Sequence, residues 1–193
     1  ANLSHTVAFS AMQFRQVLPP PTPSPTPSPT PTPTPTPIPD PLVFAEARVV
    51  DPVSSVDIAL HAGNLQLPGL GQAVIDVQFD PGVITAVGCQ PDPGGLFDAE
   101  TCVPNFEADG VYPDTARLTL TSAGGVSGSP ALGILTFQAI GAPASFTWLD
   151  LILVQFVHPG GGVIPAELYR GMVCIAPCTN IQFMPMIFKG DFP

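Results

Sequence analysis

The chain has 193 residues and a net charge of −10, because fifteen acidic residues outnumber five basic ones. Nucleic acids and anionic membrane surfaces are bound through basic patches, so this balance argues against both as partners. Only 10% of the residues are charged and 45% are hydrophobic, which favours a surface that associates with other copies or is covered by glycans. An ordinary acidic secreted protein is the alternative.

The first 18 residues form an apolar segment with an alternating pattern that predicts an extended strand. Valine, phenylalanine and threonine dominate its middle and favour a strand. A helix stays open as an alternative, because apolar residues also recur at three- and four-residue steps. The residues expected on the apolar face of the strand are Leu3, Val7, Phe9 and Ala11.

Residues 19–39 are almost only proline, threonine and serine, and from Pro21 onward every second residue is proline. Proline fixes φ and pushes the preceding residue toward extended backbone, so this segment is expected to be a polyproline II rod. At about 3.1 Å per residue it would be about 65 Å long. Its hydroxyls point to all sides of the rod, and threonines flanked by proline are typical O-glycan acceptors. The predicted acceptors are Thr22, Thr26, Thr30, Thr32, Thr34 and Thr36.

Residues 40–193 carry only strand signals, separated by turns rich in glycine, proline and aspartate. No stretch keeps a helical period for three turns without glycine or proline, so the pattern predicts an all-β sandwich or barrel. The longest apolar stretch, Trp148–Val157, includes Asp150 and Gln155 and is too short to span a bilayer. The expected strands are 43–50, 54–61, 73–79, 83–88, 115–122, 131–140, 145–157, 163–175 and 180–188.

The chain has four cysteines: Cys89, Cys102, Cys174 and Cys178. In a short extracellular chain an even number indicates disulfides, and four cysteines allow three connectivities. Pairing of sequence neighbours is the simplest of these. A zinc site made by all four is the alternative, although their C-x12-C and C-x3-C spacings differ from zinc knuckles.

No pattern predicts catalysis or a cofactor. The three histidines, His5, His61 and His158, lie outside nucleophile and metalloprotease motifs. Acidic residues crowd positions 92–114, where a calcium site is an alternative to an ordinary solvated loop. Trp148 is interpreted as a core residue, and a sugar-binding platform is the alternative.

An apolar run follows the last cysteine, and Pro185 within it suits an edge strand. Left exposed, such a strand would be adhesive. It either packs on its own sandwich or forms a contact between subunits. The residues predicted to take part in assembly are Phe183, Met186 and Phe188, together with the apolar face of the N-terminal segment.

Several stretches resemble cohesin domains in residue class and spacing: 55–61, the Gly69-Leu70-Gly71 turn, 73–81 with its Phe-Asp-Pro corner, 127–137, and Gly171–Ile175. The resemblance covers residues 44–175. It implies a jelly-roll-like antiparallel β-sandwich of about nine strands. Cohesins bind dockerin modules through one sheet face, and their relatives serve as carbohydrate-binding or cell-surface modules. The cysteines, the insertion at 91–114 and the strand after Cys178 depart from the family's pattern.

These features predict three parts: an apolar strand at 1–18, a rod at 19–39 and a sandwich at 40–193. A domain of this size is about 40 Å across, shorter than the rod. The N-terminal strand is therefore well placed to join a neighbouring subunit's sheet. The hypothesis is a secreted structural subunit of an extracellular filament or cell-surface assembly, which polymerises with copies of itself by strand donation. The alternative is a cohesin-like module that binds a dockerin or glycan at the end of a glycosylated spacer.

Overall fold

The computed structural model describes residues 40–106, 114–178 and 187–188. The chain divides into two units, Ala1–Pro37 and Ile38–Pro193, and every described residue belongs to the second. The predicted N-terminal strand, the rod with its threonines, and Phe183 and Met186 lie outside the described residues. The structure therefore describes the sandwich alone.

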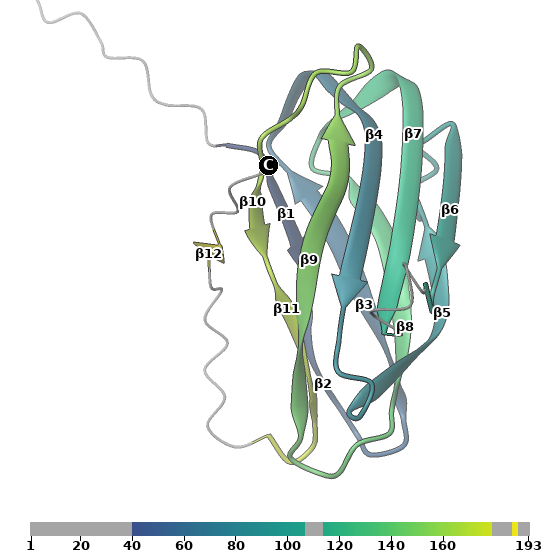
Figure 1. Ribbon diagram of the computed structural model, residues 1–193, viewed down its shortest axis with the longest axis vertical. Coiled ribbons are helices and arrows are strands. Elements are labelled where there is room, and N and C mark those ends of the chain that lie inside the picture. Colours follow the sequence, from purple (N-terminus) through teal and green to yellow (C-terminus); the bar gives the residue numbers. More distant parts are fainter. Residues whose placement is uncertain (1–39, 107–113, 179–186, 189–193) are drawn as a thin grey trace, which may run out of the picture. The chain divides into compact units, whose positions relative to one another are not determined.

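The described residues contain twelve strands and no helix (Figure 1). They make two six-stranded sheets packed face to face, which is the predicted all-β sandwich. The first sheet has the order β12-β10-β1-β3-β8-β5, and the second has the order β2-β11-β9-β4-β7-β6. The strands are β1 (Leu42–Ala45), β2 (Ala47–Val50), β3 (Ser55–Gly63), β4 (Leu65–Gln78), β5 (Ile84–Pro91), β6 (Ala99–Val103), β7 (Thr115–Gly128), β8 (Ala131–Ala139), β9 (Phe146–Val157), β10 (Glu167–Tyr169), β11 (Gly171–Ile175) and β12 (Ile187–Phe188).

The core lies between the sheets and is built from alternate residues of each strand. In β3 and β8 the alternation is regular, and Ile58, Leu60, Leu135 and Phe137 are at most 1% exposed. Phe137 also contacts Phe79 edge to face, with 5.1 Å between ring centroids. Each such side chain contributes roughly 1.5–3 kcal/mol through burial.

The predicted sandwich is confirmed, and most of its strand pairs are antiparallel as expected, but two pairs are parallel, so both sheets are mixed. β1 pairs with β10 and β2 pairs with β11 in parallel, whereas the other pairs are antiparallel. The cause is that the chain crosses from the first sheet to the second at Glu46, between β1 and β2. It crosses again in the same direction at Arg170, between β10 and β11.

The two crossings touch each other, and a glycine makes this possible. A Cβ added at Gly171 would overlap the carbonyl oxygen of Glu46 and lie 2.9 Å from Cβ of Ala45. Both expected strands at 43–50 and 163–175 are therefore split into two short strands that belong to different sheets. The strand β6 was not expected at all, since its region was interpreted as an insertion.

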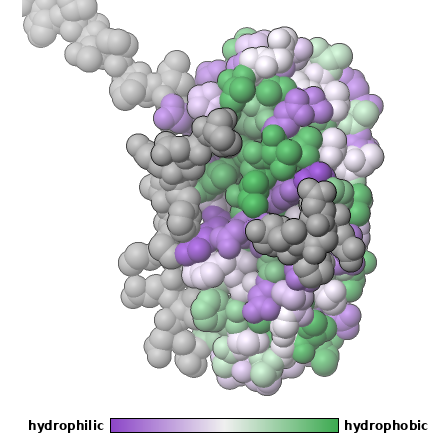
Figure 2. Space-filling view, viewed as in Figure 1, coloured by the Kyte–Doolittle hydropathy of each residue, from purple (hydrophilic) through white to green (hydrophobic). Residues whose placement is uncertain are grey.

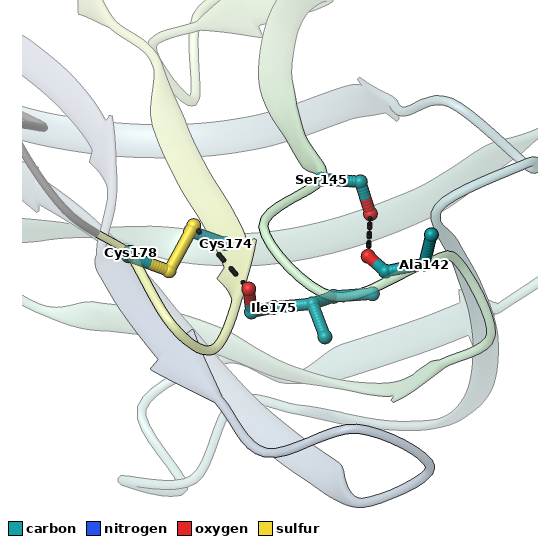
Figure 3. The surroundings of a disulfide bond; sticks show 5 residues. All are labelled: Ala142, Ser145, Cys174, Ile175 and Cys178. Carbon is teal, nitrogen blue, oxygen red and sulfur yellow. Dashed lines mark hydrogen bonds between the residues drawn. A yellow bond between two sulfur atoms is a disulfide. The ribbon is translucent and has the colours of Figure 1, made fainter.

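Both disulfides join sequence neighbours: Cys89 to Cys102 and Cys174 to Cys178. The first connects the edge strand of one sheet, β5, to the edge strand of the other, β6. The second turns the chain back immediately after β11 (Figure 3). Because each cysteine is in a disulfide, the alternative of a four-cysteine zinc site is wrong.

Candidate functional site

Four neighbouring strands of the second sheet, β9, β4, β7 and β6, share an outer surface, which we call the β9–β6 face. The strand register places outward side chains in rows across it. One row crosses all four strands and contains Ile152, Asp76, Arg117 and Val103. The next row contains Gln155, Val74, Thr119 and Thr101. The face is thus mixed, with apolar side chains on β9 and at Val103 of β6, and hydroxyls at Thr119 and Thr101.

A bidentate ion pair lies at the centre of this face. Nε of Arg117 is 2.6 Å from Oδ1 of Asp76, and Nη2 of Arg117 is 2.6 Å from Oδ2. The guanidinium carbon also lies 3.8 Å from the ring centroid of Phe106. Asp76 is only 7% exposed, so the guanidinium replaces water as the partner of its carboxylate. Parallel N–H···O bonds fix both side chains and therefore the local shape of the face.

Beside the ion pair, β9 presents a hydrophobic strip to solvent. Ile152 is 42% exposed and Val154 is 53% exposed. Figure 2 shows hydrophobic surface gathered in the upper half of this view, over β9 and β4. A hydrogen bond of 3.0 Å from Gln155 to Gln72 borders the strip. Exposed apolar side chains with a polar border are typical of protein interaction surfaces.

Trp148 lies on the outer side of β9 and is half-buried, so its interpretation as a core residue was wrong. The guanidinium carbon of Arg170 lies 4.0 Å from its ring centroid, and Phe146 meets it edge to face. Thr147 takes the inward position instead, and its hydroxyl accepts a 2.8 Å hydrogen bond from the amide of Asp80. The hydroxyl of the buried threonine therefore satisfies the backbone amide of Asp80, and the tryptophan lies on the outer side of the strand.

The outer surface of the first sheet is more polar. Among the residues whose side chains are described, Val87 is the one large exposed hydrophobic residue within its strands. Asp57 accepts a hydrogen bond from Thr136 on this surface, and His61 stacks on Phe44 with 5.0 Å between ring centroids. The apolar strip on the β9–β6 face therefore distinguishes the two sides of the sandwich.

His158 and two of the carboxylates singled out in the sequence have structural partners. Nδ1 of His158 lies 2.9 Å from the carbonyl oxygen of Gly69. Asp92 accepts a hydrogen bond from the amide of Phe97, and Asp98 accepts one from the amide of Ala123. Within residues 40–106 and 114–178, no three histidine, cysteine or acidic side chains come together as metal ligands.

Among the residues that the structure describes, two side chains have raised pKa values. Partial burial raises the pKa of Asp114, and the nearby charge of Asp80 adds to the effect. The hydrogen bond that Tyr169 donates to Glu167 raises the pKa of the tyrosine, with smaller effects of desolvation and of the Glu167 charge. In the part of the chain that the structure describes, no helix could cross a membrane.

The predicted assembly residues are mostly outside the described residues. This applies to Leu3, Val7, Phe9, Ala11, Phe183 and Met186. Phe188 is placed by its backbone alone, which pairs with Leu168 in β10. The β9–β6 face was missed in the sequence, because its ion pair joins residues 41 positions apart.

The comparison with solved structures identifies the fold as that of cohesin domains. A non-cellulosomal cohesin of Archaeoglobus fulgidus is 12% identical, with a TM-score of 0.59, and the match covers 71% of this chain and 91% of the cohesin. The seventh ScaB type I cohesin of Pseudobacteroides cellulosolvens is 11% identical, with a TM-score of 0.61 and coverages of 76% and 99%. The sixth cohesin of Acetivibrio cellulolyticus scaffoldin B, solved with a Cel5 dockerin mutant, is 14% identical, with a TM-score of 0.58 and coverages of 70% and 99%. No family model and no curated protein matches the sequence.

Proposed function

We propose that the sandwich is a non-catalytic, extracellular protein-binding module of cohesin type, which captures a partner protein on the β9–β6 face. The observation that carries the proposal is the exposed strip of Ile152 and Val154 beside the Asp76–Arg117 pair. The fold supports it as well, since the similar Acetivibrio cohesin was solved with a bound dockerin. A dockerin-like module is accordingly the kind of partner we propose.

The face combines the two elements of a specific interface. Ile152 and Val154 offer apolar side chains that a partner can cover, and the hydroxyls of Thr101 and Thr119 offer hydrogen bonds at the other side of the ion pair. Both carboxylates near the strip are compensated, because Asp76 pairs with Arg117 and Asp150 lies 3.6 Å from Arg170. A nearly neutral face suits a partner bound by packing and neutral hydrogen bonds rather than by charge.

In this proposal the rod displays the module away from its point of attachment and carries O-glycans on the threonines named above. Two disulfides agree with an oxidising compartment outside the cell.

Mass spectrometry of the native protein tests the glycans. We expect an intact mass above the 20.0 kDa of the bare chain, with increments of hexose units that localise to the rod peptides. A mass equal to the bare chain in native material would rule the glycans out.

The test of binding uses the full chain, immobilised, with the extracellular proteins of the producing organism. Val154→Asp places an unpaired charge on the strip, and Val87→Asp is the matched control, because Val87 is 50% exposed on the opposite surface. A partner is expected on the original chain and on the Val87 variant but not on the Val154 variant. The purified partner is then titrated by calorimetry, where Val154→Asp should weaken affinity at least about tenfold. Equal affinities for all three proteins would refute the assignment of the face.

The second candidate function is self-assembly, in which residues 1–18 of one copy add a strand to another copy. The favouring observation is a further group of exposed apolar side chains, among them Val53 and Ile140, away from the β9–β6 face. If the candidate is correct, Phe9→Asp should convert the assembled material to monomers in sedimentation velocity. An unchanged mass distribution for Phe9→Asp would exclude strand donation.

A further inference from the structure

Exposed apolar side chains gather at the end of the sandwich where β2 and β11 finish and β9 begins. We call this group the end patch; its members are Val49, Val53, Ile140 and Phe146, which are 49%, 80%, 52% and 48% exposed. Val49, Cys174 and Phe146 stand in one row across β2, β11 and β9. Val53 and Ile140 lie in the two turns that adjoin this row.

Backbone hydrogen bonds tie these turns to one another. The amide of Ala139 donates to the carbonyl of Ser54, which joins the β2–β3 turn to the end of β8. The amide of Ile175 donates to the carbonyl of Ser145, and the amide of Ala144 donates to the carbonyl of Ile175. Within the second turn the hydroxyl of Ser145 donates to Ala142 (Figure 3). These hydrogen bonds hold the segments of the end patch in fixed positions relative to one another.

The end patch has very little charge. Of the residues in segments 49–54, 139–146 and 174–177, only Asp51 is charged. An apolar surface on an extracellular protein with so few charges to keep copies apart marks a site of association. The β2 strand beside it is an edge of the second sheet, so one side of its backbone is not occupied by a neighbouring strand among the described residues.

The other three sheet edges are less suitable acceptors. The β5 edge has a register irregularity at Ala86 and Gly88, and the side-chain amide of Asn105 occupies the carbonyl of Ala86. The β6 edge is tied to β5 by the Cys89–Cys102 disulfide. The β12 strand is two residues long. The edge of β2, with Val49 exposed on it, is the open one among the described strands.

The end patch lies at the end of the sandwich that is opposite to the entry of the chain. β1 begins at Leu42 and β2 ends at Val50, so the end patch lies about 26 Å along these strands from the start of β1. The rod predicted at 19–39 would place residues 1–18 about 65 Å from Asp40. They are also apolar, with Arg15 as the only lysine, arginine or acidic residue, opposite in sign to Asp51.

We infer that the end patch and the free edge of β2 are the acceptor site for residues 3–14 of a second copy of this chain. The inference rests on the second candidate function, self-assembly, and does not depend on Ile152 or Val154. The contact joins two different surfaces, the N-terminal segment of one copy and the far end of the next. Such a head-to-tail contact repeats without closing and produces a linear polymer.

The test uses the full chain and sedimentation velocity over a range of concentrations. The double variant Val53→Asp/Ile140→Asp changes two exposed turn residues, so the fold should persist, as circular dichroism can verify. Val163→Asp is the matched control, since Val163 is 68% exposed near the other end of β9. We expect the double variant to weaken association at least about tenfold and the control to leave it unchanged. A peptide of residues 1–18 added in excess should compete for the acceptor site and dissociate the assemblies that the original chain forms.

The outcomes separate the inference from the function on which it rests. If the peptide dissociates the polymer but the double variant assembles normally, strand donation holds and the end patch is not the acceptor. If Val163→Asp weakens association as much as the double variant, the effect is not specific to the end patch and the inference is wrong. If the original chain is monomeric throughout, or the peptide has no effect, self-assembly by the N-terminal segment is wrong as well.

Discussion

Replacement of Arg117 by methionine should destabilise the sandwich by leaving the carboxylate of Asp76 without its bidentate partner. The side chain of Asp76 is 10% exposed and that of Arg117 is 25% exposed. Breaking a fully buried pair costs about 3–5 kcal/mol. Partial access to water reduces this, so we expect Arg117→Met to lower the free energy of unfolding by about 2–3 kcal/mol.

The assay is equilibrium unfolding in urea, with the midpoint and the slope determined together. Arg48→Met is the matched control, because Arg48 also pairs with a carboxylate, that of Glu46, but its side chain is 53% exposed. An exposed pair contributes about 0–1 kcal/mol, so the control should change stability little. The double variant Asp76→Leu/Arg117→Met removes both charges and should recover most of the loss, since apolar pairs replace buried ion pairs at small cost.

Two results would refute this reasoning. A loss below about 1 kcal/mol for Arg117→Met would mean that water or another group compensates Asp76. A double variant that is as unstable as the single one would mean that the stability comes from packing of the arginine on Phe106 rather than from its charge.

Three further predictions concern the sandwich and can be measured by the same urea assay. Phe137→Ala should cost about 3–5 kcal/mol, because it empties the fully buried centre of the core; a smaller loss would indicate that the core collapses around the site. Gly125→Ala should cost at least about 2 kcal/mol, since its φ is 76° and an added Cβ would overlap the carbonyl of Pro68, whereas Gly124→Ala enters open space and should change stability by less than about 0.5 kcal/mol. The double variant Cys89→Ser/Cys102→Ser should lose about 3 kcal/mol, as expected for a cross-link between residues 13 apart, and non-reducing peptide maps should show this pair in the original chain.

The sequence predicts the central strands well, because each has a buried face and a less buried face. In β3 and β8 the apolar residues alternate, so that Ile58 and Phe137 could be assigned to the core from the pattern alone. The strand β6 could not be recognised in this way. It is an edge strand with a sheet neighbour on one side, and only Cys102 among its residues is shielded.

Contacts between distant residues account for what the sequence could not show. Thr147 faces the core and Trp148 faces outward because the Thr147 hydroxyl bonds to the amide of Asp80, 67 residues away. The crossings at Glu46 and Arg170 depend on their mutual contact, for which Gly171 is the one local sign. The β9–β6 face likewise required the register of four strands before Ile152, Asp76 and Arg117 could be placed in one row.

The parallel pairing of the first and last long segments of the sandwich has a mechanical consequence. The chain enters beside the start of β10, and β11 ends at the opposite end of the sandwich, so tension between Asp40 and Cys174 acts along β1, β2, β10 and β11. Their hydrogen bonds are then loaded together in shear, whereas a hairpin pulled at its open end separates one bond at a time. The Cys174–Cys178 disulfide transmits force from the segment after Cys178 directly into β11. The sandwich is therefore arranged to resist stretching along its strands.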